Sequence, residues 1–176
     1  RRQRQMCIRD RTYRYLGVED GLSNRRVYCI QKDKTGYMWF LTHEGIDRYN
    51  GKEFKRYKLM DGDAEVNSLL NLNWLYIDQE GVLWEIGKKG KVFRYDQIHD
   101  CFSLVYKLPM ESFSEQPDPV TYAWLDQNKH IWLCNKDTIF LYNTDTKQVT
   151  HIKNDISEEI TDIEQIDESH FFIGTE

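Results

Sequence analysis

Residues 33–51 read DKTGYMWFLTHEGIDRYNG, and this stretch decides the fold. It contains three turn signals, DKTG, HEG and NG, separated by short segments rich in aromatic and apolar residues. An aspartate that opens a turn accepts a backbone hydrogen bond two residues later, and glycine adopts the positive φ that tight turns need. Asn-Gly is a strong signal for a two-residue hairpin turn. The stretch therefore predicts short antiparallel strands joined by tight turns.

The same pattern recurs along the chain. Aligning the chain on its recurrent aromatic residue gives spacings of 45, 48 and 40 between Trp39, Trp84, Trp132 and Phe172. An aspartate precedes the first three by six residues and the last by five, and a tyrosine follows the first three: Asp33, Asp78, Asp126, Asp167, Tyr49, Tyr95 and Tyr142. A period between about 20 and 50 residues indicates repeated structural units. We expect these aromatic residues to be core anchors packed between units.

Each unit is predicted to hold four short strands. In the first unit the strands cover residues 26–32, 37–42, 46–49 and 53–57. The second unit runs over 72–105, the third over 120–152, and a partial unit of two strands over 160–176, while 12–16 is predicted to be a lone outer strand. Four meandering strands per unit of this length are typical of a propeller blade, and solenoid repeats fit less well. The predicted fold class is all-β, a β-propeller fragment of three four-stranded blades plus partial first and last blades.

Residues 1–11 differ from the rest of the chain. They contain five arginines and one aspartate without any period, and we expect them to be a non-native tail, with a basic arm for nucleic acid or a membrane as the alternative. Residues 12–176 are then an incomplete propeller domain, because three blades with open edges cannot close a ring. We expect further blades beyond residue 176.

Charge and cysteine content limit the function classes. The formal charge is −5, and without the tail Lys+Arg falls from 24 to 19 and Asp+Glu from 29 to 28, which gives −9. Such a surface repels polyphosphate, so we expect no nucleic-acid binding by this region. Cys29, Cys101 and Cys134 lack metal-ligand spacing and are predicted to be small buried hydrophobes. Asp61-Gly62-Asp63 lacks the ligands of a calcium loop, and we expect neither a metal nor a cofactor.

A family resemblance follows from these residues. The segment EDGLSN at 19–24, the strand beginning at Val27 and the stretch 33–51 resemble the two-component regulator propeller repeat of hybrid two-component histidine kinases. The second and third units depart from it, since Gly87 and Asn135 stand where Thr42 does and Lys129 replaces the turn glycine. The resemblance covers about residues 13–176. It implies a periplasmic sensor region of an inner-membrane protein that detects an oligosaccharide, forms a homodimer and reaches the membrane only through a downstream segment.

A propeller predicts where a ligand would bind. The entry to each inner strand shares one end of the sheets with the turn between the second and third strands. The polar residues expected on this rim are Ser23, Asn24, Arg25, Arg26, His43, Glu44, Lys88, Lys89, Asn135 and Lys136. They are predicted to bind the ligand, with an ordinary solvated loop as the alternative for each. Trp74, Tyr122 and Trp124 offer a further stacking surface, unless they belong to the core.

Three functions remain open at this point. The leading hypothesis is a sensor in which an oligosaccharide or another extracellular ligand shifts a two-state dimer and so regulates a kinase that controls transcription. A passive protein-interaction scaffold is the alternative. A polysaccharide lyase or glycosidase is less favoured, because Glu44, Glu85, Asp47 and His43 are available but form no catalytic motif. No catalytic residue is assigned.

Overall fold

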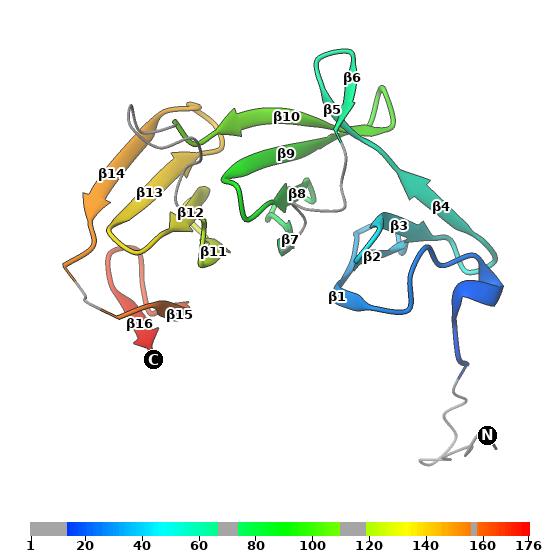
Figure 1. Ribbon diagram of the computed structural model, residues 1–176, viewed down its shortest axis with the longest axis horizontal. Helices are drawn as coiled ribbons and strands as arrows, with labels where there is room; N and C mark the ends of the chain where they lie inside the picture. Colours follow the sequence, from blue (N-terminus) through cyan, green and yellow to red (C-terminus); the bar gives the residue numbers. More distant parts are fainter. Residues whose placement is uncertain (1–13, 67–73, 110–118, 156–157) are drawn as a thin grey trace.

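The computed structural model describes residues 14–66, 74–109, 119–155 and 158–176. Apart from one short 3-10 helix, η1 (Val18–Asp20), every regular element described is a β-strand. The strands form four sheets that follow one another along an arc, with β1, β7, β11 and β15 on its inner side (Figure 1). Successive inner strands are in contact, β1 with β7, β7 with β11 and β11 with β15. The predicted all-β propeller class is confirmed, and the predicted tail at 1–11 lies outside the described residues.

Three of the sheets follow the predicted units. The first sheet has the order β1 (Val27–Lys32), β2 (Met38–Thr42), β3 (Gly45–Tyr49) and β4 (Phe54–Tyr57). The third has the order β11 (Tyr122–Leu125), β12 (His130–Cys134), β13 (Thr138–Asn143) and β14 (Val149–Lys153). The fourth pairs β15 (Ile160–Gln165) with β16 (Phe171–Thr175). All neighbouring strands in these sheets are antiparallel, as expected for a meander.

The second sheet contains the four strands predicted for this unit, β7 to β10, and two further strands from residues 59–66 that were not predicted. Its order is β6 (Ala64–Val66), β5 (Leu59–Asp61), β10 (Cys101–Lys107), β9 (Lys91–Asp96), β8 (Leu83–Ile86) and β7 (Trp74–Ile77). The chain leaving β4 turns at Gly62, which has a φ of 59°, and forms a hairpin whose strand β5 runs parallel to β10. This hairpin covers an edge of β10 that would otherwise expose unpaired backbone groups.

The predicted outer strand at 12–16 is not formed by the part that the structure describes. Residues 14–16 have no strand assignment, and 12 and 13 lie outside the described residues. A strand requires a neighbour to pair with, and none of the described ladders includes these residues. Leu16 instead packs against the buried cluster of Leu22, Phe40 and Tyr49 on the first sheet.

Each of the first three sheets has the same type of turn between its first and second strands. One oxygen of the aspartate accepts hydrogen bonds from the backbone N–H groups two and four residues later. The other oxygen accepts the indole N–H six residues later, in the pairs Asp33–Trp39 at 2.7 Å, Asp78–Trp84 at 2.8 Å and Asp126–Trp132 at 2.9 Å. Burial raises the pKa of Asp33, but the hydrogen bonds from Thr35, Trp39 and Tyr37 outweigh it and leave that pKa below its usual value. The constant spacing of six therefore reflects one shared hydrogen-bonded turn.

Substitution of Asp78 tests this turn. Asp78→Ala is expected to lower the free energy of unfolding by roughly 1–3 kcal/mol, because buried donors lose their acceptor. Asp78→Asn should lie between wild type and alanine, since its carbonyl oxygen can still serve the backbone while its amide cannot accept the indole N–H. Urea denaturation followed by tryptophan fluorescence measures both. Asp63→Ala, at an exposed turn residue, is the control, and an equal effect there would contradict this role for Asp78.

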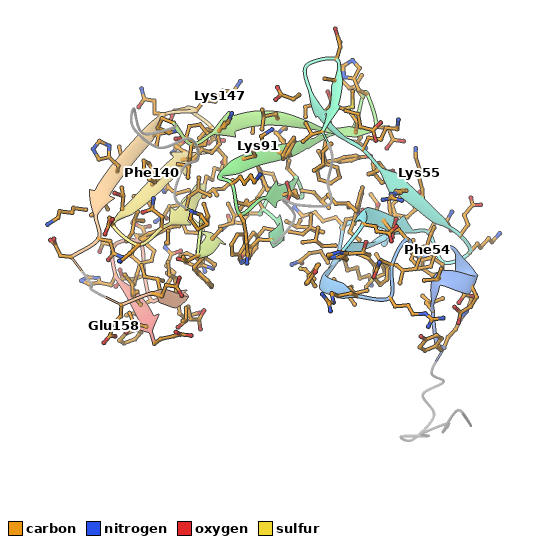
Figure 2. All side chains as sticks on the ribbon, viewed as in Figure 1. Phe54, Lys55, Lys91, Phe140, Lys147 and Glu158 are labelled. Carbon is orange, nitrogen blue, oxygen red and sulfur yellow. The ribbon has the colours of Figure 1, made fainter. Side chains whose placement is uncertain are left out.

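The recurrent tryptophans lie between sheets. Trp39, Trp84 and Trp132 are only 1%, 3% and 6% exposed, and each packs on the sheet that follows its own. The tyrosine anchors point the opposite way, so that Tyr95 of the second sheet meets Trp39 of the first with ring centroids 5.0 Å apart. Tyr142 of the third sheet likewise points back toward the second sheet, where its ring stacks on that of Tyr106 with centroids 5.1 Å apart. Figure 2 shows side chains occupying the spaces between neighbouring sheets, so the core is divided among the sheet interfaces.

Phe172 departs from the other anchors. It pairs with Glu164 in the register that places Trp39 opposite Gln31, but its side chain is 69% exposed. The expectation that it is a buried anchor is wrong for this chain, because the described residues place no sheet over this face of β16. Its neighbour Phe171, on the opposite face of the strand, is partly buried instead, and its ring lies 4.8 Å from that of Trp132.

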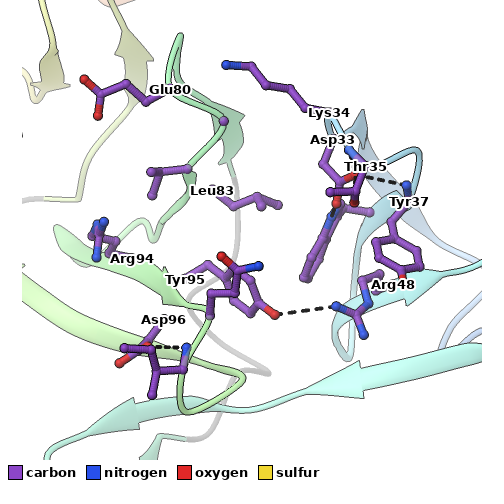
Figure 3. Close-up of a pocket in the computed structure, with 15 residues that line it drawn as sticks. Asp33, Lys34, Thr35, Tyr37, Arg48, Glu80, Leu83, Arg94, Tyr95 and Asp96 are labelled. Carbon is purple, nitrogen blue, oxygen red and sulfur yellow. Dashed lines mark hydrogen bonds between the residues drawn. The ribbon is translucent and has the colours of Figure 1, made fainter.

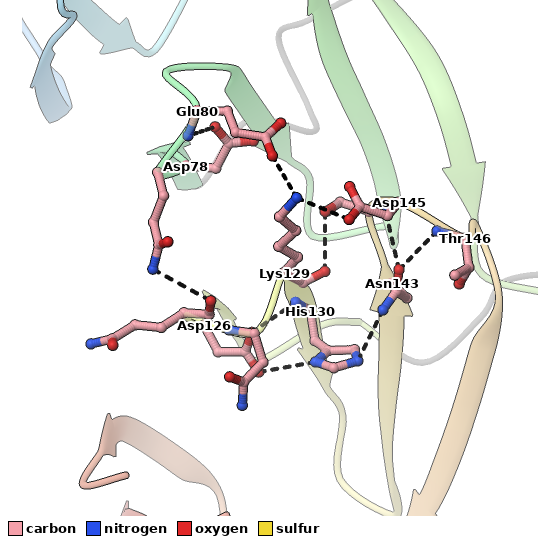
Figure 4. Close-up of polar contacts among 12 residues, drawn as sticks. Asp78, Glu80, Asp126, Lys129, His130, Asn143, Asp145 and Thr146 are labelled. Carbon is pink, nitrogen blue, oxygen red and sulfur yellow. Dashed lines mark hydrogen bonds and ion pairs between the residues drawn. The ribbon is translucent and has the colours of Figure 1, made fainter. Parts of the chain in front are cut away.

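Lys129 occupies the turn position where the first two sheets have glycine. Gly36, Gly81 and Lys129 have φ values of 95°, 92° and 64°, a region that favours glycine. The ammonium group of Lys129 pairs with Glu80 of the second sheet and with Asp145 at 2.9 Å in its own sheet (Figure 4). The lysine therefore adopts a backbone conformation that favours glycine, and its ammonium group links two adjacent turns through ion pairs.

Candidate ligand-binding site

The predicted rim residues lie at one end of the sheets. The His43 backbone N–H donates to the carbonyl oxygen of Arg26 at 3.0 Å, which joins the β2–β3 turn to the entry of β1. Two further hydrogen bonds at this end cross between sheets: Val120 N–H donates to Lys88 O at 2.7 Å, and Asn154 N–H to Asp137 O at 2.8 Å. Each joins a turn between second and third strands to the segment that leads into the next sheet. The turns and entries therefore share one end, as the propeller pattern predicts.

The first sheet has the most developed group of rim side chains. Asn24 donates from its amide to Glu44 at 3.0 Å and accepts the Arg26 backbone N–H at 2.8 Å. The Tyr28 hydroxyl lies 2.9 Å from Nδ1 of His43, and the two rings are 6.3 Å apart. We name Asn24, Arg25, Arg26, Tyr28, His43 and Glu44 the first-sheet rim cluster. The sequence predicts every member except Tyr28, which is 47% exposed on the face of β1 that no described sheet covers.

Buried polar groups hold this cluster in place. The Ser23 backbone N–H donates to Asp47 Oδ2 at 2.8 Å, and the Ser23 and Thr42 hydroxyls are 2.8 Å apart. Thr42 also donates to the carbonyl oxygen of Gly45 at 3.0 Å. Burial raises the pKa of Asp47, and the hydrogen bonds from Ser23 oppose that rise only in part. Ser23 therefore has a structural role here and anchors the entry segment to β3.

Positive charge gathers at this end of the sheets. Arg25, Arg26, Lys88, Lys89 and Lys136 are all exposed, and none forms an ion pair with a carboxylate of the described residues. The nearby carboxylate of Glu44 lies 3.8 Å from Arg56. Asn135 has a turn role, since its side-chain oxygen accepts the Thr138 backbone N–H at 2.7 Å. A chain with a formal charge of −5 thus presents, on its rim, exposed cations that form no ion pair with a carboxylate of the described ranges.

The second predicted set of aromatics belongs to the core. Trp74 packs against the cluster between the second and third sheets, and Tyr122 and Trp124 pack against the cluster that contains Trp132. The rings of Trp124 and Trp132 are 6.0 Å apart, and the Tyr122 hydroxyl donates to Asp162 of the fourth sheet at 3.0 Å. Packing between sheets therefore explains these three side chains.

A cleft of about 510 Å³ opens at the opposite end, between the first and second sheets. Its lining includes Asp33, Tyr37, Arg48, Gly81, Tyr95 and Ile98, and no predicted rim residue (Figure 3). The Arg48 guanidinium lies 4.5 Å from the Tyr37 ring and 3.5 Å from the Tyr95 hydroxyl, so it serves the contact between the sheets.

The sequence contains a signal for this cleft. Gly81 and Thr35 occupy the turn positions at which Lys129 and Glu80 form their ion pair across the next sheet interface, so among the described residues no such pair spans the cleft.

The carboxylates considered for catalysis are not gathered in one site. Glu85 and Asp47 are 0% and 1% exposed, on strands of different sheets, and Glu44 pairs with Arg56 at the rim. Residues 14–66, 74–109, 119–155 and 158–176 contain no group of three or more His, Cys, Asp or Glu side chains able to hold a metal ion. Across the same described ranges, no helix has the length and apolar character needed to span a bilayer.

Comparison with known proteins agrees with this geometry. Residues 21–44 match the family model of the two component regulator propeller. Comparison with curated proteins finds no match. The extracellular domain of the hybrid two component system BT3049 from B. thetaiotaomicron is 26% identical, with a TM-score of 0.68 over 92% of this chain and 24% of that chain. The corresponding domain of BT4673 from B. thetaiotaomicron is 20% identical, with a TM-score of 0.67 over 94% of this chain and 21% of that one.

A third solved structure shows the fold alone. Virginiamycin B lyase from Staphylococcus aureus is 16% identical, with a TM-score of 0.62 over 87% of this chain and 50% of that chain. The architecture is thus that of a propeller-type domain. Within that class, the chain contains a two-component regulator propeller repeat and resembles the extracellular domains of hybrid two-component systems. It spans about a quarter of the length of the two domains from B. thetaiotaomicron.

Proposed function

We propose that this chain is part of the periplasmic ligand-sensing region of a hybrid two-component histidine kinase that detects an oligosaccharide and controls transcription. The observation that supports this most is the regulator-propeller match at residues 21–44, which contains the first two strands and all six residues of the first-sheet rim cluster. The fold similarity to extracellular domains of hybrid two-component systems over more than nine-tenths of the chain adds to it.

Ligand binding acts on such a sensor through a difference in affinity. A ligand shifts the equilibrium between the two states of a dimer only by the difference between its binding free energies for those states. Each tenfold difference in affinity corresponds to about 1.4 kcal/mol. The rim suits this role because the turns at Lys88 and Asp137 are hydrogen-bonded to the segments that lead into the following sheets. A ligand held across two such turns would therefore favour one relative placement of the sheets.

The complete sensor region that contains this chain provides the test. A panel of neutral and acidic polysaccharide fragments is added, and the melting temperature and the autophosphorylation rate of the full-length kinase are measured. A true ligand present at 100 times its Kd is expected to stabilise the protein by about 2.7 kcal/mol and to change the phosphorylation rate. A panel in which no glycan changes either quantity would refute the proposal.

A further inference from the structure

We infer that the cleft between the first and second sheets binds a small aromatic carboxylate, with Arg48 holding the carboxylate and with Tyr95, Val82 and Ile98 contacting the ring of the ligand. This cleft lies at the end of the sheets opposite the rim, so the inference does not depend on the proposed function. It follows from three features of the described residues: a space left open where the next interface is bridged, a guanidinium without a carboxylate partner, and apolar side chains beside it.

The cleft is open where the next interface is closed by an ion pair. Between the second and third sheets, Lys129 pairs with Glu80 across the two turns. The corresponding positions in the cleft are Gly81 and Thr35, neither of which carries a charge. The volume of about 510 Å³ falls within the range of ligand pockets, which is roughly 300–1,000 Å³. Both walls belong to described sheets, so the cleft does not arise from an uncovered strand face.

Arg48 supplies the positive charge. Its guanidinium carbon lies 4.5 Å from the ring centre of Tyr37, 5.4 Å from that of Trp39 and 5.2 Å from that of Tyr57. Among the described residues it donates one hydrogen bond, to the Tyr95 hydroxyl at 3.5 Å, and forms no ion pair (Figure 3). Aromatic rings contact the face of a guanidinium, whereas its N–H donors point outward in its plane. Its edge can therefore hold a carboxylate, which accepts two parallel N–H bonds.

The acidic side chains that line the cleft have other partners. Asp33 accepts backbone N–H groups of its own turn and an indole N–H. Asp96 accepts backbone N–H groups of its own turn and lies 2.6 Å from a histidine ring nitrogen. Glu80 pairs with Lys129. None of the three pairs with Arg48, so the guanidinium is a cation that can attract an anionic ligand into the cleft.

Apolar side chains lie beside the guanidinium. Tyr95 and Val82 are partly buried lining residues, and Ile98, in the turn between β9 and β10, is 90% exposed. The Tyr95 side chain is held in place, because its hydroxyl donates to Asp100 at 2.6 Å and its ring packs on Trp39. Covering these apolar surfaces with a flat ring removes them from water, which favours binding. A ring that carries a carboxylate therefore matches both the apolar wall and the guanidinium.

Isothermal titration calorimetry of the complete sensor region with 4-hydroxybenzoate tests the inference. This probe is expected to bind with a Kd of about 1 mM or tighter. Its neutral amide, 4-hydroxybenzamide, keeps the ring without the charge, and acetate keeps the charge without the ring. Each of these two compounds is expected to bind at least about tenfold more weakly than 4-hydroxybenzoate, because it meets only one of the two surfaces.

Two variants locate the binding site. Arg48→Gln removes the charge that holds the carboxylate. Gly81→Lys/Thr35→Glu keeps Arg48 and builds across the cleft the ion pair found at the next interface, where Lys129 occupies the same turn position at a φ of 64°. Each variant is expected to bind 4-hydroxybenzoate at least about tenfold more weakly than wild type.

Each variant has a matched control. Gly62→Lys/Ala64→Glu makes the same kind of change at exposed positions of the β5–β6 hairpin, and Arg26→Gln removes an exposed arginine from the rim. Both controls are expected to bind the probe within about twofold of wild type, as for most surface sites. Circular dichroism checks the fold of all four variants.

The outcomes are distinct from those of the glycan panel. Binding that is lost in both cleft variants and retained in both controls supports the site. Wild-type affinity in the folded Gly81→Lys/Thr35→Glu variant, or loss of binding in Arg26→Gln, places the ligand elsewhere and overturns the site. Equal binding of the amide overturns the role of Arg48, and equal binding of acetate shows an adventitious anion only. Absence of binding by 4-hydroxybenzoate overturns the inference and leaves the proposed sensor function standing.

Discussion

Replacing Trp84 with alanine is expected to lower the free energy of unfolding by about 3–5 kcal/mol. The indole is 3% exposed and packs with Leu108, Val120 and Ile131 in the interface between the second and third sheets. Its removal leaves a cavity there and also takes away the hydrogen bond to Asp78. Equilibrium urea denaturation followed by circular dichroism measures the change.

Phe172→Ala is the matched control for this substitution. Phe172 has the same strand register as Trp84 but is 69% exposed in this chain. Its truncation is expected to change the free energy of unfolding by less than about 0.5 kcal/mol, as for most surface sites. Equal losses in the two variants would show that burial between sheets is not what makes the tryptophan important.

Glu85→Leu is expected to stabilise the chain at neutral pH. Glu85 lies on β8, is 0% exposed, and neither carboxylate oxygen has a hydrogen-bond partner among the described residues. Burial raises the pKa of this carboxyl well above its ordinary value of 4.5. An unpaired buried carboxylate is costly, and an apolar residue of similar size removes that cost.

The pH dependence has a definite sign. Below pH 4.5 the carboxyl of Glu85 is protonated in both the folded and unfolded chain and costs no ionisation energy. As the pH rises above that value, the unfolded chain releases the proton while the folded chain retains it, so the contribution of Glu85 to stability falls by about 1.4 kcal/mol per pH unit until the raised pKa is reached. The contribution of the protonated Glu85 carboxyl to stability is therefore complete at acid pH and is lost as the pH increases.

Urea denaturation at about pH 4.5 and about pH 7.5 measures this dependence. The gain from Glu85→Leu should be larger at the higher pH, whereas Glu164→Leu, at an exposed position on β15, should show the same pH dependence as wild type. A Glu85→Leu variant that is less stable than wild type at the higher pH would contradict this account of the buried carboxyl.

The repeat explains why much of the fold is predictable. An aspartate and a tryptophan six residues apart are joined by one hydrogen bond in each of the first three sheets, so their spacing in the sequence records a local structure. The turn signals around them define the strand limits closely. These hydrogen bonds join residues that are close together in the sequence, so they can be predicted without knowing which distant segments pair.

Features that depend on distant pairing were not predictable in the same way. The β5–β6 hairpin extends the second sheet because β5 pairs in parallel with β10, about forty residues further along the chain. Asp61-Gly62 was a readable hairpin signal, but nothing local specifies which sheet such a hairpin joins. The exposure of Phe172 likewise depends on what covers β16, which its own register does not reveal.

The candidate site was predictable in position but not in detail. The order of strands in a propeller places Asn24, Arg26, His43 and Glu44 at one end, and the structure brings these four together. Tyr28 was missed because an aromatic residue on an inner strand is usually packed against a neighbouring sheet. Its exposure becomes visible only when the packing on that face of β1 is known.

Hydrogen–deuterium exchange of the complete sensor region, with and without the glycan of the panel that raises its melting temperature most, tests ligand sensing by this rim most directly. The account predicts slower exchange on ligand addition for backbone amides at 23–28 and 42–46, with unchanged exchange in the turns at 33–37 and 143–148. Unchanged exchange throughout the propeller, or protection confined to the turns at the opposite end, would contradict it.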